Sequence, residues 1–114
     1  MEHYQWAVIE ANLDPAIGSE QKSTSPVLII SNEEYNESMH YVTVLPLTST
    51  RRDLYPSEVF LPSGKAGQPL NSIIMAHQIR TLSRQRLGKL YGYLDDMQYR
   101  QDVHAAIKEH LDLE

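Results

Sequence analysis

Short runs of apolar and β-branched residues, closely spaced and separated by turn residues, most constrain how this chain can fold. The longest run is Val27 to Ile30, far short of the roughly 20 apolar residues that a membrane helix needs. Proline, glycine, asparagine and serine gather between the runs, as they do between the strands of small β folds. The pattern predicts strands at residues 6–11, 26–31, 40–47, 57–61, 71–79 and 87–94.

The remaining segments are predicted as loops, turns and one long helix. The run at 26–31 is continuous rather than alternating, so this strand is expected to be buried on both faces. Asp95 or Asp96 can cap a helix that runs to about Leu111. We expect polar loops at 12–25 and 48–56, an acidic turn at 32–39, a turn at 62–69, a helical turn at 83–86, and one apolar helix face made of Met97, Val103, Ala106, Ile107 and Leu111.

This order of elements indicates a small, strongly bent antiparallel sheet or partly closed barrel with one helix on it. A length of 114 residues suits a single domain spanning 1–114 and is too short for a TIM barrel. The core is small, so pairing with a second copy would add stability. The chain has no cysteine, which excludes disulfides and cysteine-bound zinc and fits the cytoplasm. No signal-peptide pattern is visible at the first residues.

The charge is unevenly distributed. The whole chain carries a net charge of −5, which by itself argues against a nucleic-acid partner. Residues 1–50 hold seven acids and one base, and residues 93–114 hold six acids and two bases. Residues 51–92, in contrast, hold seven bases and two acids. A basic middle between acidic ends indicates an anionic partner, although scattered surface lysines and arginines would give the same count.

Polar residues in the predicted loops are the candidates for chemistry. The five histidines show no metal-ligand spacing, and no glycine-rich phosphate loop is present. The loops at one end of a small barrel can converge on a groove. The candidates that these loops and strand ends supply are Glu20, Gln21, Ser25, Thr48, Ser49, Arg51, Arg52, His77, Gln78 and Arg80.

Several blocks of sequence together form a recognisable pattern. The most specific block joins Gly18-Ser19-Glu20-Gln21 to Pro26-Val27-Leu28. Further blocks follow at Leu45-Pro46-Leu47-Thr48-Ser49, Gln78-Ile79-Arg80-Thr81 and Arg86-Leu87-Gly88. In this order, the blocks resemble the MazF/PemK/Kid toxins of type II toxin–antitoxin systems. The resemblance implies an SH3-like barrel of the MazF/CcdB toxin type that forms a homodimer. It also implies a sequence-specific endoribonuclease that cuts single-stranded RNA without a metal or cofactor, and a MazE-like antitoxin that covers the RNA groove.

The resemblance also implies roles for individual residues. Thr48 stands where the family places a hydroxyl that donates to a phosphate oxygen. Glu20 and Gln21 match the family's loop motif, and Ser49, Arg51 and Arg52 follow Thr48 in the basic second loop. Gln78 can read a base edge, and His77 is a candidate general acid. Arg80 is expected to contact phosphate or to form a structural ion pair.

One position departs from the family pattern. Where the family reads arginine before the proline of the second strand, this chain reads Thr24-Ser25-Pro26. Serine has neither the charge nor the reach of a guanidinium. Two explanations are open: a catalytically inactivated variant, which the intact flanking pattern favours, or a natural member that uses another base. Arg51 and Arg52 could in principle substitute for the arginine, although they stand in a different loop. The alternatives to a nuclease are a non-catalytic module that binds RNA or antitoxin, and a CcdB-like gyrase inhibitor.

Overall fold

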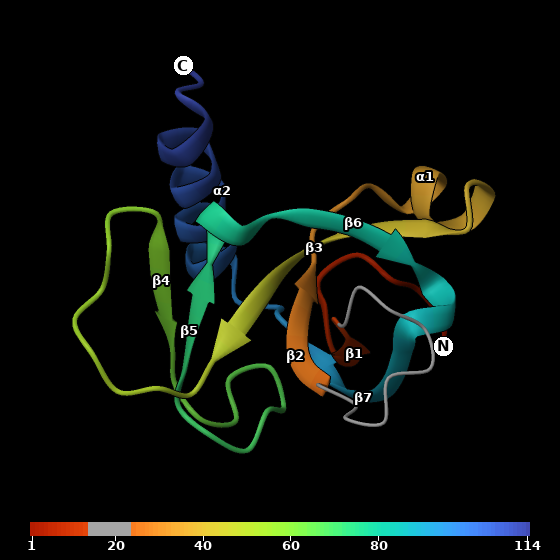
Figure 1. Cartoon of the computed structure of the whole chain (residues 1–114), viewed down its shortest axis with the longest axis horizontal. Helices are drawn as coiled ribbons and strands as arrows, with labels where there is room; N and C mark the ends of the chain where they lie inside the picture. Colours follow the sequence, from red (N-terminus) through yellow and green to blue (C-terminus); the bar gives the residue numbers. More distant parts are fainter. Residues whose placement is uncertain (14–23) are drawn as a thin grey trace.

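The structure of the protein is a computed structural model, and it describes residues 1–13 and 24–114. The described residues form a bent antiparallel sheet with a helix at the C-terminal end (Figure 1). The strands are β1 (Ala7–Asn12), β2 (Thr24–Ile29), β3 (Tyr41–Thr48), β4 (Glu58–Leu61), β5 (Ser72–Met75), β6 (Arg80–Ser83) and β7 (Leu87–Tyr93). The helices are α1 (Glu33–Ser38), α2 (Met97–Leu111) and the single 3-10 turns η1 (Ala76–Gln78) and η2 (Arg84–Arg86).

Strand β3 joins the two halves of the sheet. The strand order is β4-β5-β3-β2-β1-β7, and β6 pairs with β3 outside this path. The first half of β3 pairs with β6 and its middle, at Val44, Leu45 and Pro46, pairs with β2. Its end, at Leu47 and Thr48, pairs with Ile74 and Ile73 of β5. Figure 1 shows β3 crossing from the β1–β2–β7 side to the β4–β5 side, where α2 stands. The loop that follows Thr48 therefore begins where the two halves of the sheet meet.

The central strands are buried on both faces. In β1 and β2, Val8 and Leu28 pack with the residues of α2, whereas Ile9, Val27 and Ile29 pack with the residues of β6 on the other face. This arrangement confirms the two-sided burial predicted from the continuous apolar run at 26–31. Trp6, Leu94, Val103 and Ala106 complete the first of the two clusters.

Residues 32–39, predicted as an acidic turn, instead contain the helix α1. Asn32 caps this helix, because its side-chain oxygen accepts a hydrogen bond from the Tyr35 backbone N–H at 2.8 Å. Glu33 and Glu34 lie in the first turn, where the helix dipole favours negative charge. The prediction missed α1 because a six-residue helix is too short to show apolar periodicity. Its sequence signals are limited to the capping residue and the acidic residues of the first turn.

The bounds of the C-terminal helix were predicted almost to the residue, but two of the residues predicted for its apolar face are exposed. Asp96 is the cap, accepting from the backbone N–H groups of Gln98 and Tyr99 at 2.9 and 3.3 Å. Val103 and Ala106 are buried against the sheet, as expected. Met97 and Leu111, assigned to the same face, are 61% and 46% exposed. They lie at the two ends of α2, beyond the part of the helix that the short strands cover.

The predicted strand at 71–79 is in fact the short strand β5 followed by a 3-10 turn. β5 ends at Met75, and the backbone then makes the 3-10 turn η1, in which Ile79 N–H bonds to Ala76 C=O. The chain re-enters the sheet as β6, which the sequence did not separate from its neighbours. The expected helical turn at 83–86 is present as η2, where the Ser83 hydroxyl accepts from Gln85 N–H. With β6, the described residues form seven strands rather than the six predicted.

Two glycines set the position of the turn between β4 and β5. Gly67 has φ +85°, and a Cβ on it would lie 2.2 Å from the backbone oxygen of Tyr91. A Cβ on Gly92, in β7, would lie 2.6 Å from the backbone oxygen of Ala66. Neither position has room for a side chain. The turn therefore packs directly on β7, and this contact fixes the residues that follow it.

Candidate functional site

Ser25 and Thr48 line the same pocket. Val27 is paired with Pro46 in the antiparallel register of β2 and β3, and continuing that register by two residues brings Ser25 opposite Thr48. The hydroxyl of half-buried Ser25 donates to the backbone oxygen of Leu47 at 3.4 Å. We call the cavity in front of them the Ser25 pocket. It measures about 320 Å³ and is lined by Thr24, Ser25, Pro26, Leu47, Thr48, Ser49, Gln68, Pro69, Leu70, Ser72 and Tyr91.

The Thr48 hydroxyl is positioned by the turn that follows β3. Its oxygen accepts a hydrogen bond from the Thr50 backbone N–H at 3.2 Å and donates to the Thr50 hydroxyl at 3.1 Å. The backbone bond fixes the oxygen, while the proton points to another exposed hydroxyl. An anionic ligand oxygen could replace Thr50 as the acceptor of that proton, because charge-assisted hydrogen bonds are stronger than neutral ones.

The turn between β4 and β5 forms the far wall of this pocket through Gln68. Its side chain is 1% exposed. The amide oxygen accepts from Ala66 N–H at 3.1 Å, and the amide nitrogen donates to Pro62 C=O at 2.8 Å. A buried amide that satisfies backbone groups on both sides holds a turn rigid. Leu70, at the end of this turn, therefore has a fixed position at the pocket mouth.

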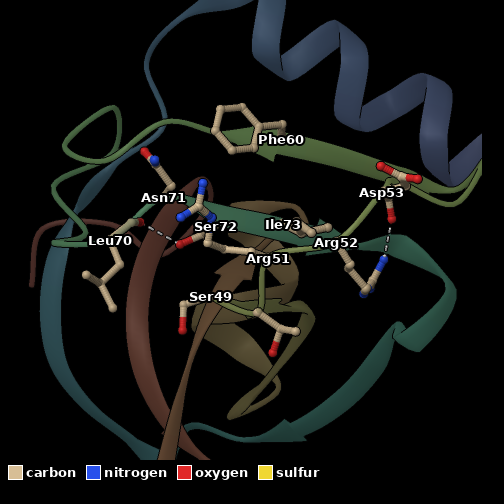
Figure 2. Close-up of a pocket in the computed structure, with 10 residues that line it drawn as sticks. Ser49, Arg51, Arg52, Asp53, Phe60, Leu70, Asn71, Ser72 and Ile73 are labelled. Atoms are coloured by element: carbon tan, nitrogen blue, oxygen red, sulfur yellow. Dashed lines mark hydrogen bonds between the residues drawn. The ribbon is translucent and has the colours of Figure 1, made fainter.

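A second, larger cavity adjoins the Ser25 pocket. We call it the Arg51 pocket; it measures about 700 Å³ (Figure 2). Ser49, Leu70 and Ser72 line both cavities, so the two adjoin, and we call them together the groove. The ten residues that line the Arg51 pocket are Ser49, Thr50, Arg51, Arg52, Asp53, Phe60, Leu70, Asn71, Ser72 and Ile73.

Arg51 and Arg52 are neighbours in the sequence but have different roles in the structure. The two terminal nitrogens of Arg52 donate to the two carboxylate oxygens of Glu58 at 2.6 and 2.7 Å. The guanidinium also lies 4.3 Å from the centre of the Tyr55 ring. The Arg51 side chain is exposed and, within residues 1–13 and 24–114, forms no hydrogen bond or ion pair. Arg51 is thus the cation of this pocket that is available to a ligand.

Glu58 organises the loop that carries both arginines. Its carboxylate is fully buried, and besides Arg52 it accepts hydrogen bonds from Tyr55 N–H at 2.8 Å and His77 Nε2 at 2.9 Å. The hydrogen bonds from Arg52, with those from Tyr55 and His77, lower the pKa of Glu58 to about 2. The hydrogen bonds that Arg52 donates to Glu58 raise the pKa of Arg52. The pair is therefore fully ionised near neutral pH.

Three of the site residues expected from the sequence lie away from these pockets. His77 is in η1, bonded to Glu58, with its ring 6.4 Å from the ring of His110 on α2. Gln78 follows it in η1 and is exposed. Arg80, in β6, donates to the backbone oxygen of Leu13 at 3.2 Å. The structure therefore groups Ser25, Thr48, Ser49, Arg51 and Arg52 along the groove and places His77, Gln78 and Arg80 elsewhere.

Glu20 and Gln21 lie outside the described residues, and their expected roles stay predictions. Across the described ranges, histidines and carboxylates form no group of three or more that could hold a metal ion. None of the helices in those ranges is long and apolar enough to cross a membrane.

Phe60, Leu70 and Asn71 are groove residues that the sequence did not predict. A weak signal existed for Phe60: it stands between Val59 and Leu61 in a strand, and alternation puts it on the opposite face from them. Leu70 and Asn71 gave no such signal, because they lie in a turn whose position depends on its contact with β7.

Comparison with known proteins assigns the chain to a protein family. The family described as "PemK-like, MazF-like toxin of type II toxin-antitoxin system" matches residues 4–111. The chain belongs to this PemK/MazF toxin family. Endoribonuclease MazF9 of Mycobacterium tuberculosis is 32% identical to it in an alignment of 109 positions, which covers 91% of this chain and 92% of that protein. The family membership confirms the resemblance read from the sequence blocks.

Solved structures agree with this assignment. The Mycobacterium tuberculosis toxin MazF-mt6 superposes with a TM-score of 0.78 at 29% identity, covering 96% of this chain and 99% of the toxin. An endoribonuclease from a mycobacterial species, solved in complex with its cognate antitoxin, gives a TM-score of 0.78 at 26% identity, covering 96% of this chain and 95% of that protein. The bent sheet with its C-terminal helix is therefore the MazF fold, as expected.

Proposed function

We propose that this PemK/MazF chain is the toxin of a toxin–antitoxin pair. In this proposal it acts in the cytoplasm as a homodimeric, sequence-specific endoribonuclease on single-stranded RNA. The observation that carries the proposal is the groove along which Ser25, Thr48 and Arg51 lie. The relatives named endoribonuclease, and the one solved with a cognate antitoxin, support the reaction and the partner. A flexible antitoxin segment lying in the groove would block the RNA.

The reaction needs no metal in this proposal. The 2′-oxygen of one nucleotide attacks the adjacent phosphorus, and the bond from phosphorus to the 5′-oxygen of the next nucleotide breaks. One proton leaves the 2′-hydroxyl, and one is delivered to the departing 5′-oxygen. The protein positions the chain and stabilises the extra negative charge on the phosphoryl oxygens. The Thr48 hydroxyl is suited to donate to one of those oxygens, because its oxygen is held by Thr50 N–H.

Ser25 makes this chain a slow enzyme in the same proposal. Its hydroxyl donates to the Leu47 carbonyl and carries no charge. Losing a donor that stabilises the transition state costs on the order of 10²–10³-fold in rate. Arg51, the available cation of the adjoining pocket, does not line the Ser25 pocket itself. We therefore expect the natural chain to bind single-stranded RNA and to cut it slowly.

Cleavage of a single-stranded RNA in EDTA by four proteins tests the proposal. The proteins are the natural chain, Ser25→Arg, Ser25→Gln and the double variant Ser25→Arg/Thr48→Val. Because Ser25 is half-buried at the edge of a cavity of about 320 Å³, a longer side chain can extend into it. Ser25→Arg should cut roughly 100-fold faster or more, while Ser25→Gln, which has length without charge, should not. The double variant should lose the gain.

The outcomes separate the parts of the proposal. If the natural chain already cuts as fast as Ser25→Arg, the impairment is wrong and the nuclease assignment stands. If every protein binds RNA and none cuts it, the chain is a non-catalytic binding module. If none binds RNA, the nuclease assignment itself is wrong. Sedimentation at micromolar concentration tests the homodimer, which should show twice the 13.1 kDa of one chain.

A further inference from the structure

We propose that the Arg51 pocket binds one unpaired nucleobase of the RNA, next to the phosphate held in the Ser25 pocket, and that Phe60 and Asn71 determine which base it accepts. This inference rests on the proposed function, because it assumes that single-stranded RNA occupies the groove. It goes further by assigning a base-binding site to residues that neither the sequence blocks nor the family likeness singled out.

Phe60 presents a flat apolar surface in this pocket. Its neighbours Val59 and Leu61 are buried, whereas Phe60 is 45% exposed on the opposite face of β4. Within the described ranges, no aromatic or cationic side chain is stacked on its ring. Unpaired bases of single-stranded RNA commonly stack on exposed aromatic rings of this kind. The ring contributes affinity for any base, so selection must come from a polar neighbour.

Asn71 is that polar neighbour, and only one of its two side-chain polar atoms is left to bind a ligand. Its side-chain oxygen accepts a hydrogen bond from Ser63 N–H at 2.8 Å. The amide nitrogen, with two N–H groups, therefore remains as the donor that Asn71 offers to a ligand. A donor at this point favours a base edge that carries an acceptor, such as the carbonyl oxygens of uracil or guanine, and disfavours an amino group.

Arg51 supplies the positive charge between the two pockets. Figure 2 shows its side chain extending toward Ser72 and Asn71, whereas Arg52 and Asp53 lie at the other end of the pocket. Arg52 is held there by Glu58, and it also donates to the Asp53 backbone oxygen at 3.0 Å. The unpaired cation therefore lies on the same side as the shared wall of Ser49, Leu70 and Ser72. A guanidinium in that place suits the phosphate that links the bound base to the cut site.

The aromatic ring of Phe60, the amide donor of Asn71 and the guanidinium of Arg51 together favour a nucleotide over an acidic peptide. A peptide carboxylate would be satisfied by Arg51 alone, and it would use neither a flat ring nor a donor set to one side of that ring. A nucleotide uses all three, with its base on Phe60, an acceptor facing Asn71 and a phosphate at Arg51. The cavity of about 700 Å³ has room for such a unit.

The test selects bound sequences from a random pool of single-stranded RNA, in EDTA, with four proteins. The four are the natural chain, Asn71→Asp, Phe60→Leu and Phe60→Tyr. A fifth protein, Tyr41→Leu, is the matched control. Tyr41 is 49% exposed on β3 and lines neither pocket of the groove. Asp at position 71 keeps the oxygen that Ser63 N–H needs and replaces the donor by an acceptor. Each RNA affinity is measured alongside the enriched sequences.

The natural chain should enrich an acceptor-bearing base at one position, and Asn71→Asp should lose that enrichment while the other positions keep theirs. Phe60→Leu should bind all sequences roughly 10-fold or more weakly, and Phe60→Tyr and Tyr41→Leu should bind as the natural chain does. If the natural chain binds RNA and the Asn71 and Phe60 variants give the same profile and affinity, the base site is wrong and the proposed function stands. If the natural chain binds no RNA, both are wrong.

Discussion

Arg52 and Glu58 form a two-pronged ion pair in which both terminal nitrogens of the arginine reach both oxygens of the carboxylate, at 2.6 and 2.7 Å. Glu58 is at the start of β4 and Arg52 is in the loop before it. Because the carboxylate is fully buried, this ion pair anchors the loop before β4 to the protein interior. The neighbouring Arg51 is left exposed at the groove.

Replacing these two arginines by alanine should therefore have opposite consequences. Arg52→Ala leaves the buried Glu58 carboxylate with fewer partners, so the midpoint of thermal unfolding should fall by about 5–10 °C for a chain of this size. Arg51→Ala should leave that midpoint unchanged and weaken RNA binding, with a smaller salt dependence. Thermal melts and RNA titrations at two salt concentrations measure both effects. Equal melting losses in the two variants would contradict the assignment.

The low pKa of Glu58 predicts how acid affects folding. The folded-state pKa of about 2 lies below the ordinary value of 4.5. The ionised carboxylate therefore stabilises the fold above about pH 4.5, and this stabilisation is lost as the pH falls toward 2. The free energy of unfolding of the natural chain should exceed that of Glu58→Gln at pH 5, and the difference should shrink as the pH falls. Urea unfolding at several pH values measures it; a constant difference would refute the prediction.

Thr48 can be tested by a pair of variants that differ by one hydroxyl. Thr48→Val keeps the shape of the side chain and removes the donor, whereas Thr48→Ser keeps the hydroxyl that Thr50 N–H positions. In the Ser25→Arg background, Thr48→Val should lower the rate of RNA cleavage by roughly 10²-fold, and Thr48→Ser should keep most of it. Unfolding midpoints serve as the control for folding. Equal cleavage by both variants would show that the Thr48 hydroxyl takes no part in the reaction.

Gly67 and Gly64 offer a matched test of the turn that shapes the groove. Both have positive φ, +85° and +81°, so alanine at either costs about 1 kcal/mol in backbone strain. Only at Gly67 would the new Cβ also meet a backbone atom, the Tyr91 oxygen, at 2.2 Å; at Gly64 nothing lies within 4 Å. Gly67→Ala should therefore lose a further ~1–3 kcal/mol of unfolding free energy. Chemical denaturation measures both variants, and similar losses would show that the turn can move away from β7.

Features that depend on neighbours in the sequence were predictable. Asp96 and Ser83 begin helical turns because their side chains bond to backbone groups two or three residues ahead. The continuous run at 26–31 identified a strand buried on both faces, and β2 is such a strand. The short helix α1 and the break between β5 and β6 were missed. Their signals are weak locally, and pairing with β3 and β4 decides where each strand ends.

In the candidate site too, residues with a local sequence signal were predictable, whereas relationships that depend on long-range contacts were not. Thr48 could be selected from its sequence block, and its place beside Ser25 agrees with the pairing of β2 and β3. The contrast between Arg51 and Arg52 could not be read from an Arg-Arg pair, because it depends on a buried carboxylate six residues beyond the second arginine. The hydrogen bond between His77 and Glu58, which holds His77 away from the groove, likewise has no signal in the local sequence.

The sequence by itself determined the family, through the blocks that resemble its members. It also determined most of the strands along the chain and the long helix, because these follow from local hydrogen bonding and from the spacing of apolar residues. The tertiary structure alone decided what lies along the groove. Strand β3 brings Ser25 and Thr48 together, and the contact of Gly67 with β7 sets the turn that carries Leu70 and Asn71. Long-range pairing and close backbone packing join residues far apart in the chain, and no local pattern encodes such contacts.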